Sequence, residues 1–253
     1  MSENEHPRYF VHSLEKGLDV LMAFSKKGPD LTLSEIAQIT GMAPPTASRF
    51  TRTLEDLGYL VRDQLTKGYR LSPKILRIGF SFIGNLDLRR RVSVQLLEIT
   101  KQFNVDTACA ILDQTEVTYI ERFRSNSMLS LHLTVGSRLP AHTSAMGRAI
   151  LAFMDPKEAR AIVETSELSA NTPFTITDKT LLLERLEAVR QAGVAINRQE
   201  LAVGMAAVAA PVMAGSKVEG SIGASFPIQR LEEEGFLETI RDKIMETARK
   251  VAM

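Results

Sequence analysis

The strongest constraint on the fold lies at residues 33–71, where two short amphipathic helices and a hairpin are predicted in immediate succession. Ser34 can cap the first helix, and Gly41 can end it, because a tight turn needs a residue that tolerates positive φ. The second helix starts at a proline pair, which suits a first helical turn. This order is typical of a winged helix-turn-helix, whose second helix enters the DNA major groove.

The second helix is predicted to bury one face and to present the other to DNA. Its apolar residues recur every three or four positions, at Ala47, Phe50, Leu54 and Leu57. Its polar face carries Thr46, Ser48, Arg49, Thr51 and Arg52. Short hydroxyl side chains let a helix approach base edges, while arginine binds guanine or phosphate. The predicted DNA-binding residues of the two helices and the wing are Ser34, Pro45, Thr46, Ser48, Arg49, Arg52, Lys67, Tyr69 and Arg70.

The charge of this region sets a limit on how it can bind DNA. Residues 1–72 contain nine Lys/Arg and nine Asp/Glu, so non-specific attraction to phosphates is expected to be modest. Affinity must then depend on local placement of cations and on dimerisation. The later basic run at residues 89–91 is interpreted as a solvated helix face, with a surface that faces DNA as the alternative. A helical hairpin inside another kind of domain would explain the two helices but not the wing that follows them.

The motif is flanked by further predicted helices. One covers residues 13–24, with its apolar side formed by Leu14, Leu18, Leu21 and Met22, and closes the core of the DNA-binding domain. Residues 73–103 are predicted to form a helical linker with a break near Gly84. Exposed apolar residues on such a linker often pack against a second copy of the chain.

From residue 106 the apolar periodicity becomes that of strands. Three strands are expected first, at 107–112, 117–122 and 129–133. Three helices follow: one at 144–154, a second that begins after the cap Asp155, and a third that runs from the cap Asp178 to Gly193. Three further strands at 194–197, 206–213 and 221–226 precede a C-terminal helix. We therefore predict an α+β fold with a largely antiparallel sheet. The expected domains are residues 1–72, 73–103 and 104–253.

Composition is that of an ordinary soluble protein, with 44% hydrophobic residues and a net charge of +1. No apolar run approaches the roughly 20 residues that a membrane span needs. The first ten residues do not resemble a signal peptide. The one cysteine, Cys109, excludes an internal disulfide framework, so we expect a cytoplasmic protein.

Four ordered blocks of the sequence resemble the IclR-type transcriptional regulators. They are residues 13–18, residues 54–60, residues 135–149, and residues 197–200 with Gly204 and 208–212. The middle block is most similar to regulators of aromatic-acid catabolism, which respond to protocatechuate, hydroxybenzoate or β-ketoadipate. The resemblance implies a GAF-like effector domain, a homodimer or dimer of dimers on a palindromic DNA operator, and control by a small organic acid. An activator would also contact RNA polymerase.

The resemblance also implies a pocket in the C-terminal domain. The family's effector-binding positions match Met128, Leu139, Ala145, Met146, Asn197 and Ala207. Ser144 and Gly147 delimit a helix start whose N–H groups suit a carboxylate, and the Asn197 amide can donate. Some members have an acidic residue and a cysteine where this chain has Asn197 and Ala207, so an aromatic or longer acid is favoured. Pro45 replaces a serine often found there, so base contacts at that position are not inferred.

Alternative roles exist for several of these residues. Without the resemblance, a core role is favoured over a ligand contact for Met128, Leu139 and Met146. Arg122 and Arg124 could bind an acid, although a surface role is favoured for both arginines. A regulator responding to a non-aromatic small acid is the nearest alternative function.

An enzyme is the alternative from another class. His142, Ser144 and Glu200 carry the groups of a hydrolase triad, but no Gly-x-Ser-x-Gly elbow surrounds Ser144. The sequence contains no phosphate-binding glycine loop or dinucleotide fingerprint. His132 and His142 lack a partner at metal-ligand spacing. We therefore predict no catalytic residues, no metal and no cofactor.

Overall fold

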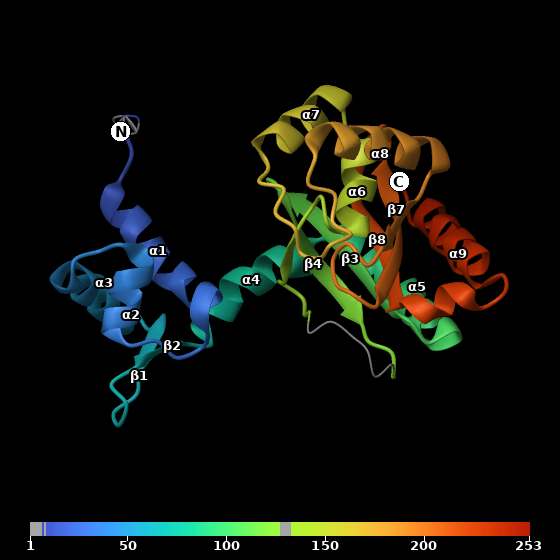
Figure 1. Ribbon diagram of the computed structural model, residues 1–253. Helices are drawn as coiled ribbons and strands as arrows, with labels where there is room; N and C mark the ends of the chain where they lie inside the picture. The colour runs from blue at the N-terminus through green and yellow to red at the C-terminus, as the bar shows by residue number, and fades with distance from the viewer. Residues whose placement is uncertain (1–6, 8, 127–132) are drawn as a thin grey trace. The chain divides into compact units, whose positions relative to one another are not determined.

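The computed structural model describes residue 7, residues 9–126 and residues 133–253. The described chain divides into two compact units, Met1–Asn85 and Leu86–Met253, which are considered separately (Figure 1). Among the described residues, no helix is both long enough and apolar enough to cross a membrane.

The N-terminal unit confirms the predicted winged helix-turn-helix. Its described elements are α1 (His12–Lys27), α2 (Leu33–Thr40), α3 (Pro44–Asp56), β1 (Leu60–Arg62), β2 (Tyr69–Leu71) and α4 (Lys74–Asn85). Gly41 ends α2 in the left-handed region at φ 67°, as the turn requires. The predicted cap of α2 was wrong by two residues. Thr32, not Ser34, is the N-cap, and it forms a capping box with Glu35.

The core of this unit differs from the predicted apolar stripes. In α1 the buried residues are Val20, Ala23 and Phe24, whereas the predicted Leu14, Leu18 and Met22 are more than half exposed. In α3, Ala47 and Leu54 are buried as predicted, but Leu57 is exposed. Thr51 takes a core position instead of a place on the polar face. Its hydroxyl donates to the Ala47 carbonyl at 3.0 Å, which removes the cost of burying it.

The C-terminal unit confirms the predicted antiparallel sheet. Among the described residues, six strands follow the order β5-β4-β3-β8-β7-β6. Their bounds are β3 (Asp106–Asp113), β4 (Glu116–Phe123), β5 (Arg138–Pro140), β6 (Ala195–Arg198), β7 (Met205–Ala214) and β8 (Lys217–Pro227). Every neighbouring pair is antiparallel. The predicted strand at 129–133 lies almost entirely outside the described residues, and the short edge strand β5 was not predicted.

Helices cover both faces of this sheet (Figure 1). The helices of the unit are α5 (Asp87–Phe103), α6 (Ala145–Phe153), α7 (Pro156–Thr165), α8 (Lys179–Ala192) and α9 (Phe236–Lys250), with a short 3₁₀ turn at Ile228–Glu232. One core lies between the sheet and helices α5 and α9, and a second lies between the sheet and helices α6 and α8. Alternate residues of each strand supply the two cores, as the pleat dictates.

The helical linker predicted at 73–103 is divided between the units. The break predicted near Gly84 is confirmed, since α4 ends at Asn85 and α5 begins at Asp87. Helix α5 is not a free connector, because Leu88, Val92 and Leu96 are buried in a core of the C-terminal unit. Burial of that apolar face, at roughly 25 cal/mol per Å², fixes α5 to the sheet.

Candidate effector pocket and DNA-binding surface

The predicted DNA-binding residues of α3 lie on its accessible side. Pro45, Arg49 and Arg52 are exposed, and Thr46 and Ser48 are partly exposed. Ser34 is exposed on α2. Such a helix presents hydroxyl and guanidinium groups to a partner, which is the chemistry of base and phosphate contacts.

Of the three DNA contacts predicted on the wing, two have accessible side chains and one is buried. Lys67 is exposed at the tip, and Arg70 pairs with Asp30 and Asp63, each at 3.1 Å. Tyr69 as a DNA contact is a wrong prediction, because its side chain is 2% exposed and packs in the core of the unit. The alternation of a strand places Tyr69 inward and Arg70 outward.

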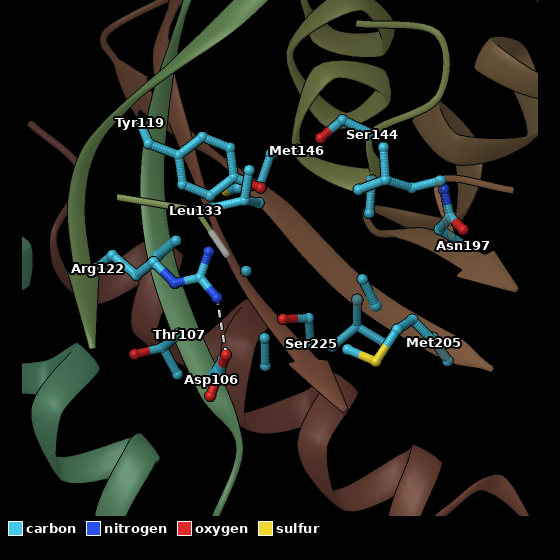
Figure 2. Close-up of a pocket in the computed structure, with 18 residues that line it drawn as sticks. Asp106, Thr107, Tyr119, Arg122, Leu133, Ser144, Met146, Asn197, Met205 and Ser225 are labelled. Carbon is cyan, nitrogen blue, oxygen red and sulfur yellow. Dashed lines mark hydrogen bonds and ion pairs between the residues drawn. The ribbon is translucent and has the colours of Figure 1, made fainter. Parts of the chain in front are cut away.

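A pocket lies in the C-terminal unit between the start of α6 and one face of the sheet (Figure 2). Its lining residues are Asp106, Thr107, Ala108, Tyr119, Arg122, Leu133, Ser144, Ala145, Met146, Asn197, Leu201, Met205, Ala206, Ala207, Val208, Gly223, Ala224 and Ser225. Five predicted effector-binding residues are brought together here, namely Ser144, Ala145, Met146, Asn197 and Ala207. Apolar walls with a few convergent polar groups are typical of a small-molecule site.

The start of α6 forms one polar end of the pocket. Ser144 is the N-cap of α6, and its hydroxyl accepts from the Gly147 N–H at 3.4 Å. The first N–H groups of a helix have no carbonyl partner within it, so those of Ala145 and Met146 suit an anion. Tyr119 hydrogen-bonds Ser144, and burial raises the pKa of Tyr119 to about 12 against the opposing effect of Arg122. The phenol therefore stays neutral and able to donate.

Arg122 and Asp106 form the second polar end. The Arg122 side chain is 5% exposed, and its Nη2 donates to Asp106 Oδ2 at 2.8 Å. Asp106 Oδ1 also accepts from the Ser125 N–H at 2.8 Å and its hydroxyl at 2.9 Å. Figure 2 shows the guanidinium directed into the pocket between Tyr119 and Asp106. A surface role for Arg122 was thus the wrong interpretation, whereas Arg124 is exposed.

A bulge in β4 explains why sequence reasoning missed Arg122. In a regular strand, residues three positions apart point to opposite faces. The register with β3 shifts between Cys109 and Ala110, which pair with Glu121 and Tyr119. Ile120 is therefore an extra residue, and both Tyr119 and Arg122 point into the pocket. A bulge leaves little trace in a single sequence.

The floor of the pocket is a row of residues paired across four strands. Asp106 pairs with Ser225, Ser225 with Ala207, and Ala207 with Asn197. Three strand spacings separate the ends of this row by about 14 Å. The middle of the floor is flat because its side chains are small. No side chain fits at Gly223, because a Cβ there would lie 2.8 Å from the Val208 carbonyl oxygen.

Two predicted effector-binding residues, Leu139 and Gly147, are not among the residues that line the pocket. Leu139 packs on the α6 side core instead. Gly147 permits close packing, since a Cβ there would overlap the Ala141 backbone. Met128 lies outside the described residues.

Asn197 lines the pocket, but its amide is already engaged. Its Nδ2 donates to the Thr143 carbonyl at 2.6 Å, and its Oδ1 accepts from the Glu200 N–H at 3.1 Å. The expected donation to a ligand is therefore replaced by a role in positioning the turn before α6.

A buried ion pair supports the same turn. Arg148 is 1% exposed, and its Nη1 donates to Glu200 Oε1 at 2.6 Å while its Nη2 pairs with Oε2. Its Nε donates to the His142 carbonyl at 2.7 Å. The same contacts contradict the hydrolase alternative, because they engage two members of the supposed triad with other partners. The Glu200 carboxylate binds Arg148, and the His142 ring nitrogen Nε2 donates to the Ser169 carbonyl at 3.1 Å.

His142 gives a testable pH dependence. Burial, as the main cause, lowers the pKa of His142 from 6.5. The neutral form is favoured by folding, so its stabilisation is complete above pH 6.5 and is lost as pH falls from there toward the lower folded pKa. We expect the melting temperature of the C-terminal unit to fall as the pH is lowered from about 7 through 6.5 and below, and His142→Asn to reduce that fall. Calorimetry at several pH values measures it. His12→Asn, on exposed α1, is the control, and an unchanged pH profile in His142→Asn would contradict the assignment.

Comparison with known proteins shows that both units match families of known description. Residues 80–253 match the family described as bacterial transcriptional regulator IclR C-terminal, and residues 13–64 match the IclR helix-turn-helix domain. The Pca regulon regulatory protein of Pseudomonas putida is 31% identical over 224 residues, which cover 88% of this chain and 76% of the relative. The p-hydroxybenzoate hydroxylase transcriptional activator of Acinetobacter baylyi is 30% identical over 217 residues, covering 84% and 79%.

A solved structure shows the same fold over almost the whole chain. It is an IclR homologue complexed with 4-hydroxybenzoate from Microbacterium hydrocarbonoxydans, with a TM-score of 0.82 and 22% identity, covering 94% of this chain and 97% of that one. The relatives are named as transcriptional regulators rather than enzymes.

Proposed function

Because the chain belongs to the IclR family of bacterial transcriptional regulators, we propose that it controls catabolic genes as a cytoplasmic homodimer or dimer of dimers, through a small organic acid bound in the pocket beneath α6. The observation that carries this proposal is the buried pocket with a helix start, a neutral phenol and a guanidinium on its walls. These groups complement an anion and its polar substituents.

An aromatic acid is the effector that the pocket supports best. Small side chains at Ala108, Ala207 and Gly223 make a flat floor for a ring. The floor row from Asp106 to Asn197 spans about 14 Å, which is much longer than a two-carbon acid. One neighbour of the same fold is a complex with 4-hydroxybenzoate, and one relative is named for p-hydroxybenzoate hydroxylase. The second candidate, a non-aromatic acid of similar length, is favoured only by the shared anion chemistry.

A dimer is supported by apolar side chains that the N-terminal unit leaves exposed. They are Leu14, Leu18 and Met22 on α1 and Leu76, Ile78, Phe80 and Phe82 on α4, each more than half exposed within the described residues. Exposed apolar side chains that share one helix face often mark interfaces, and Leu14, Leu18 and Met22 recur at four-residue spacing on one face of α1. Two copies would set two α3 helices on the half-sites of a palindromic operator, and an activating form would also engage RNA polymerase.

Control follows if the acid binds the DNA-competent and incompetent arrangements with different affinity. The ligand then shifts the populations of the two arrangements, and the size of the shift is set by the difference between its two affinities. A tenfold change in operator affinity needs about 1.4 kcal/mol of differential binding.

The proposal predicts an acid-dependent change in operator binding. The operator is first obtained by selection from random-sequence DNA with the full chain. An electrophoretic shift on that DNA is then measured with benzoate, 4-hydroxybenzoate, adipate and glyoxylate. We expect an aromatic acid to change the affinity at least tenfold and glyoxylate to have no effect. Selection of no DNA, or no acid-dependent change, would contradict the proposal, and a response to adipate alone would favour the second candidate.

A further inference from the structure

The two polar ends of the pocket differ in charge, and this difference carries information about the ligand. At the α6 end, helix N–H groups and the Tyr119 phenol present a partial positive charge with neutral donors. At the other end, the Arg122 charge is cancelled by Asp106 at 2.8 Å. Both members of that pair are 5% exposed, so solvent screens their interaction little.

A carboxylate gains most where positive charge is not already neutralised. Placed against Arg122, a carboxylate would also meet the like charge of Asp106. Placed at the start of α6, it would meet helix N–H groups and the neutral Tyr119 hydroxyl, which can all donate to it. The end formed by Arg122 and Asp106 instead offers donors and acceptors side by side, which suits a neutral group that both donates and accepts, such as a hydroxyl.

We propose that Asp106 and Arg122 form a specificity pair that accepts the hydroxyl of an aromatic acid and rejects a second carboxylate, while the acid's own carboxylate binds at the start of α6. This inference rests on the proposed function and names the ligand class of the same pocket. Ser225, which pairs with Asp106 across β3 and β8, lies beside this end (Figure 2).

The pair itself sets the specificity, so a change of its charge should switch the ligand preference. Asp106→Asn keeps the side-chain shape but leaves the Arg122 charge without its cancelling carboxylate. A second carboxylate on the ligand would then replace the missing charge. The double variant Asp106→Asn with Arg122→Gln removes both charges and should restore the preference for a neutral group.

Calorimetric titration of the full chain with benzoate, 4-hydroxybenzoate and terephthalate tests the proposal. For the wild type we expect 4-hydroxybenzoate to bind at least about tenfold more tightly than benzoate, as hydrogen bonds to charged groups allow, and terephthalate to bind more weakly than 4-hydroxybenzoate. The ratio of terephthalate affinity to 4-hydroxybenzoate affinity should rise at least tenfold in Asp106→Asn and return toward the wild-type value in the double variant. Comparing ratios cancels the size difference between the ligands.

Asp113→Asn is the matched control, because Asp113 lies on the same strand β3 but pairs with Arg138 outside the pocket. Its ratio should equal that of the wild type. Equal ratios in Asp106→Asn and wild type, tighter wild-type binding of terephthalate, or no binding of any of the three acids would overturn the specificity pair. Acid-dependent operator binding, measured separately, tests the proposed function, so the two can fail independently.

Discussion

Replacing Arg148 by alanine is expected to cost the C-terminal unit about 3–5 kcal/mol of unfolding free energy, because the change leaves the Glu200 carboxylate buried without its partner. Arg148 also joins the His142 carbonyl to the 197–200 segment. Calorimetry or urea unfolding measures the loss, which corresponds to roughly 10 °C in melting temperature. Because the turn before α6 is held by the same contacts, affinity for an acid should fall as well.

The control for Arg148→Ala is Arg138→Ala, which removes an ion pair on the surface of the same unit. Arg138 contacts Asp113 at 3.1 Å and Glu116 at 2.8 Å with 40% of its side chain exposed, and such pairs contribute about 0–1 kcal/mol. Changing Arg148 and Glu200 together to methionine should recover part of the stability, because no buried charge is left alone. A cost below about 1 kcal/mol for Arg148→Ala would show that the pair does not support the fold.

Replacing Arg49 by alanine is expected to weaken operator binding by about 1–3 kcal/mol for each half-site. Arg49 is exposed on α3, on the side that carries Thr46 and Ser48. If it reads a base, the loss applies to operator DNA and not to unrelated DNA. If it binds a phosphate, both affinities fall and the salt dependence decreases by about one ion per subunit. Electrophoretic shifts at several salt concentrations separate the two.

Arg160→Ala is the matched control for Arg49→Ala. Arg160 is exposed on α7 of the C-terminal unit, so its removal changes net charge equally without touching the winged helix. We expect near wild-type affinity for it. Operator binding by Arg49→Ala as tight as that of the wild type would make the assignment of α3 as the recognition helix wrong.

Local sequence signals predicted the elements well, because their physical causes are local. Gly41 and Gly193 end α2 and α8 in the left-handed region, and Asp178 caps α8. The polar side of α3 and the start of α6 follow from periodicity and capping. The family resemblance added the pocket, and four of the six positions that it implied line it, together with Ser144 from the helix start.

What the sequence did not predict depends on contacts between distant segments. Arg122 enters the pocket because of a bulge opposite β3, and Tyr69 is buried because the strand face it occupies closes the N-terminal core. Asn197 is engaged by the Thr143 carbonyl, 54 positions away in sequence. Helix α5 looks like a linker until the sheet that covers its apolar face is known.

The most direct test of the regulatory account is the reciprocity of its two binding reactions. Calorimetric titration gives the affinity of the full chain for 4-hydroxybenzoate with and without saturating operator DNA, and an electrophoretic shift gives operator affinity with and without the acid. If the acid controls DNA binding through the pocket, the two ratios must be equal, and we expect both to differ from one by at least about tenfold. Ratios of one in both measurements, with both ligands bound, would contradict the account.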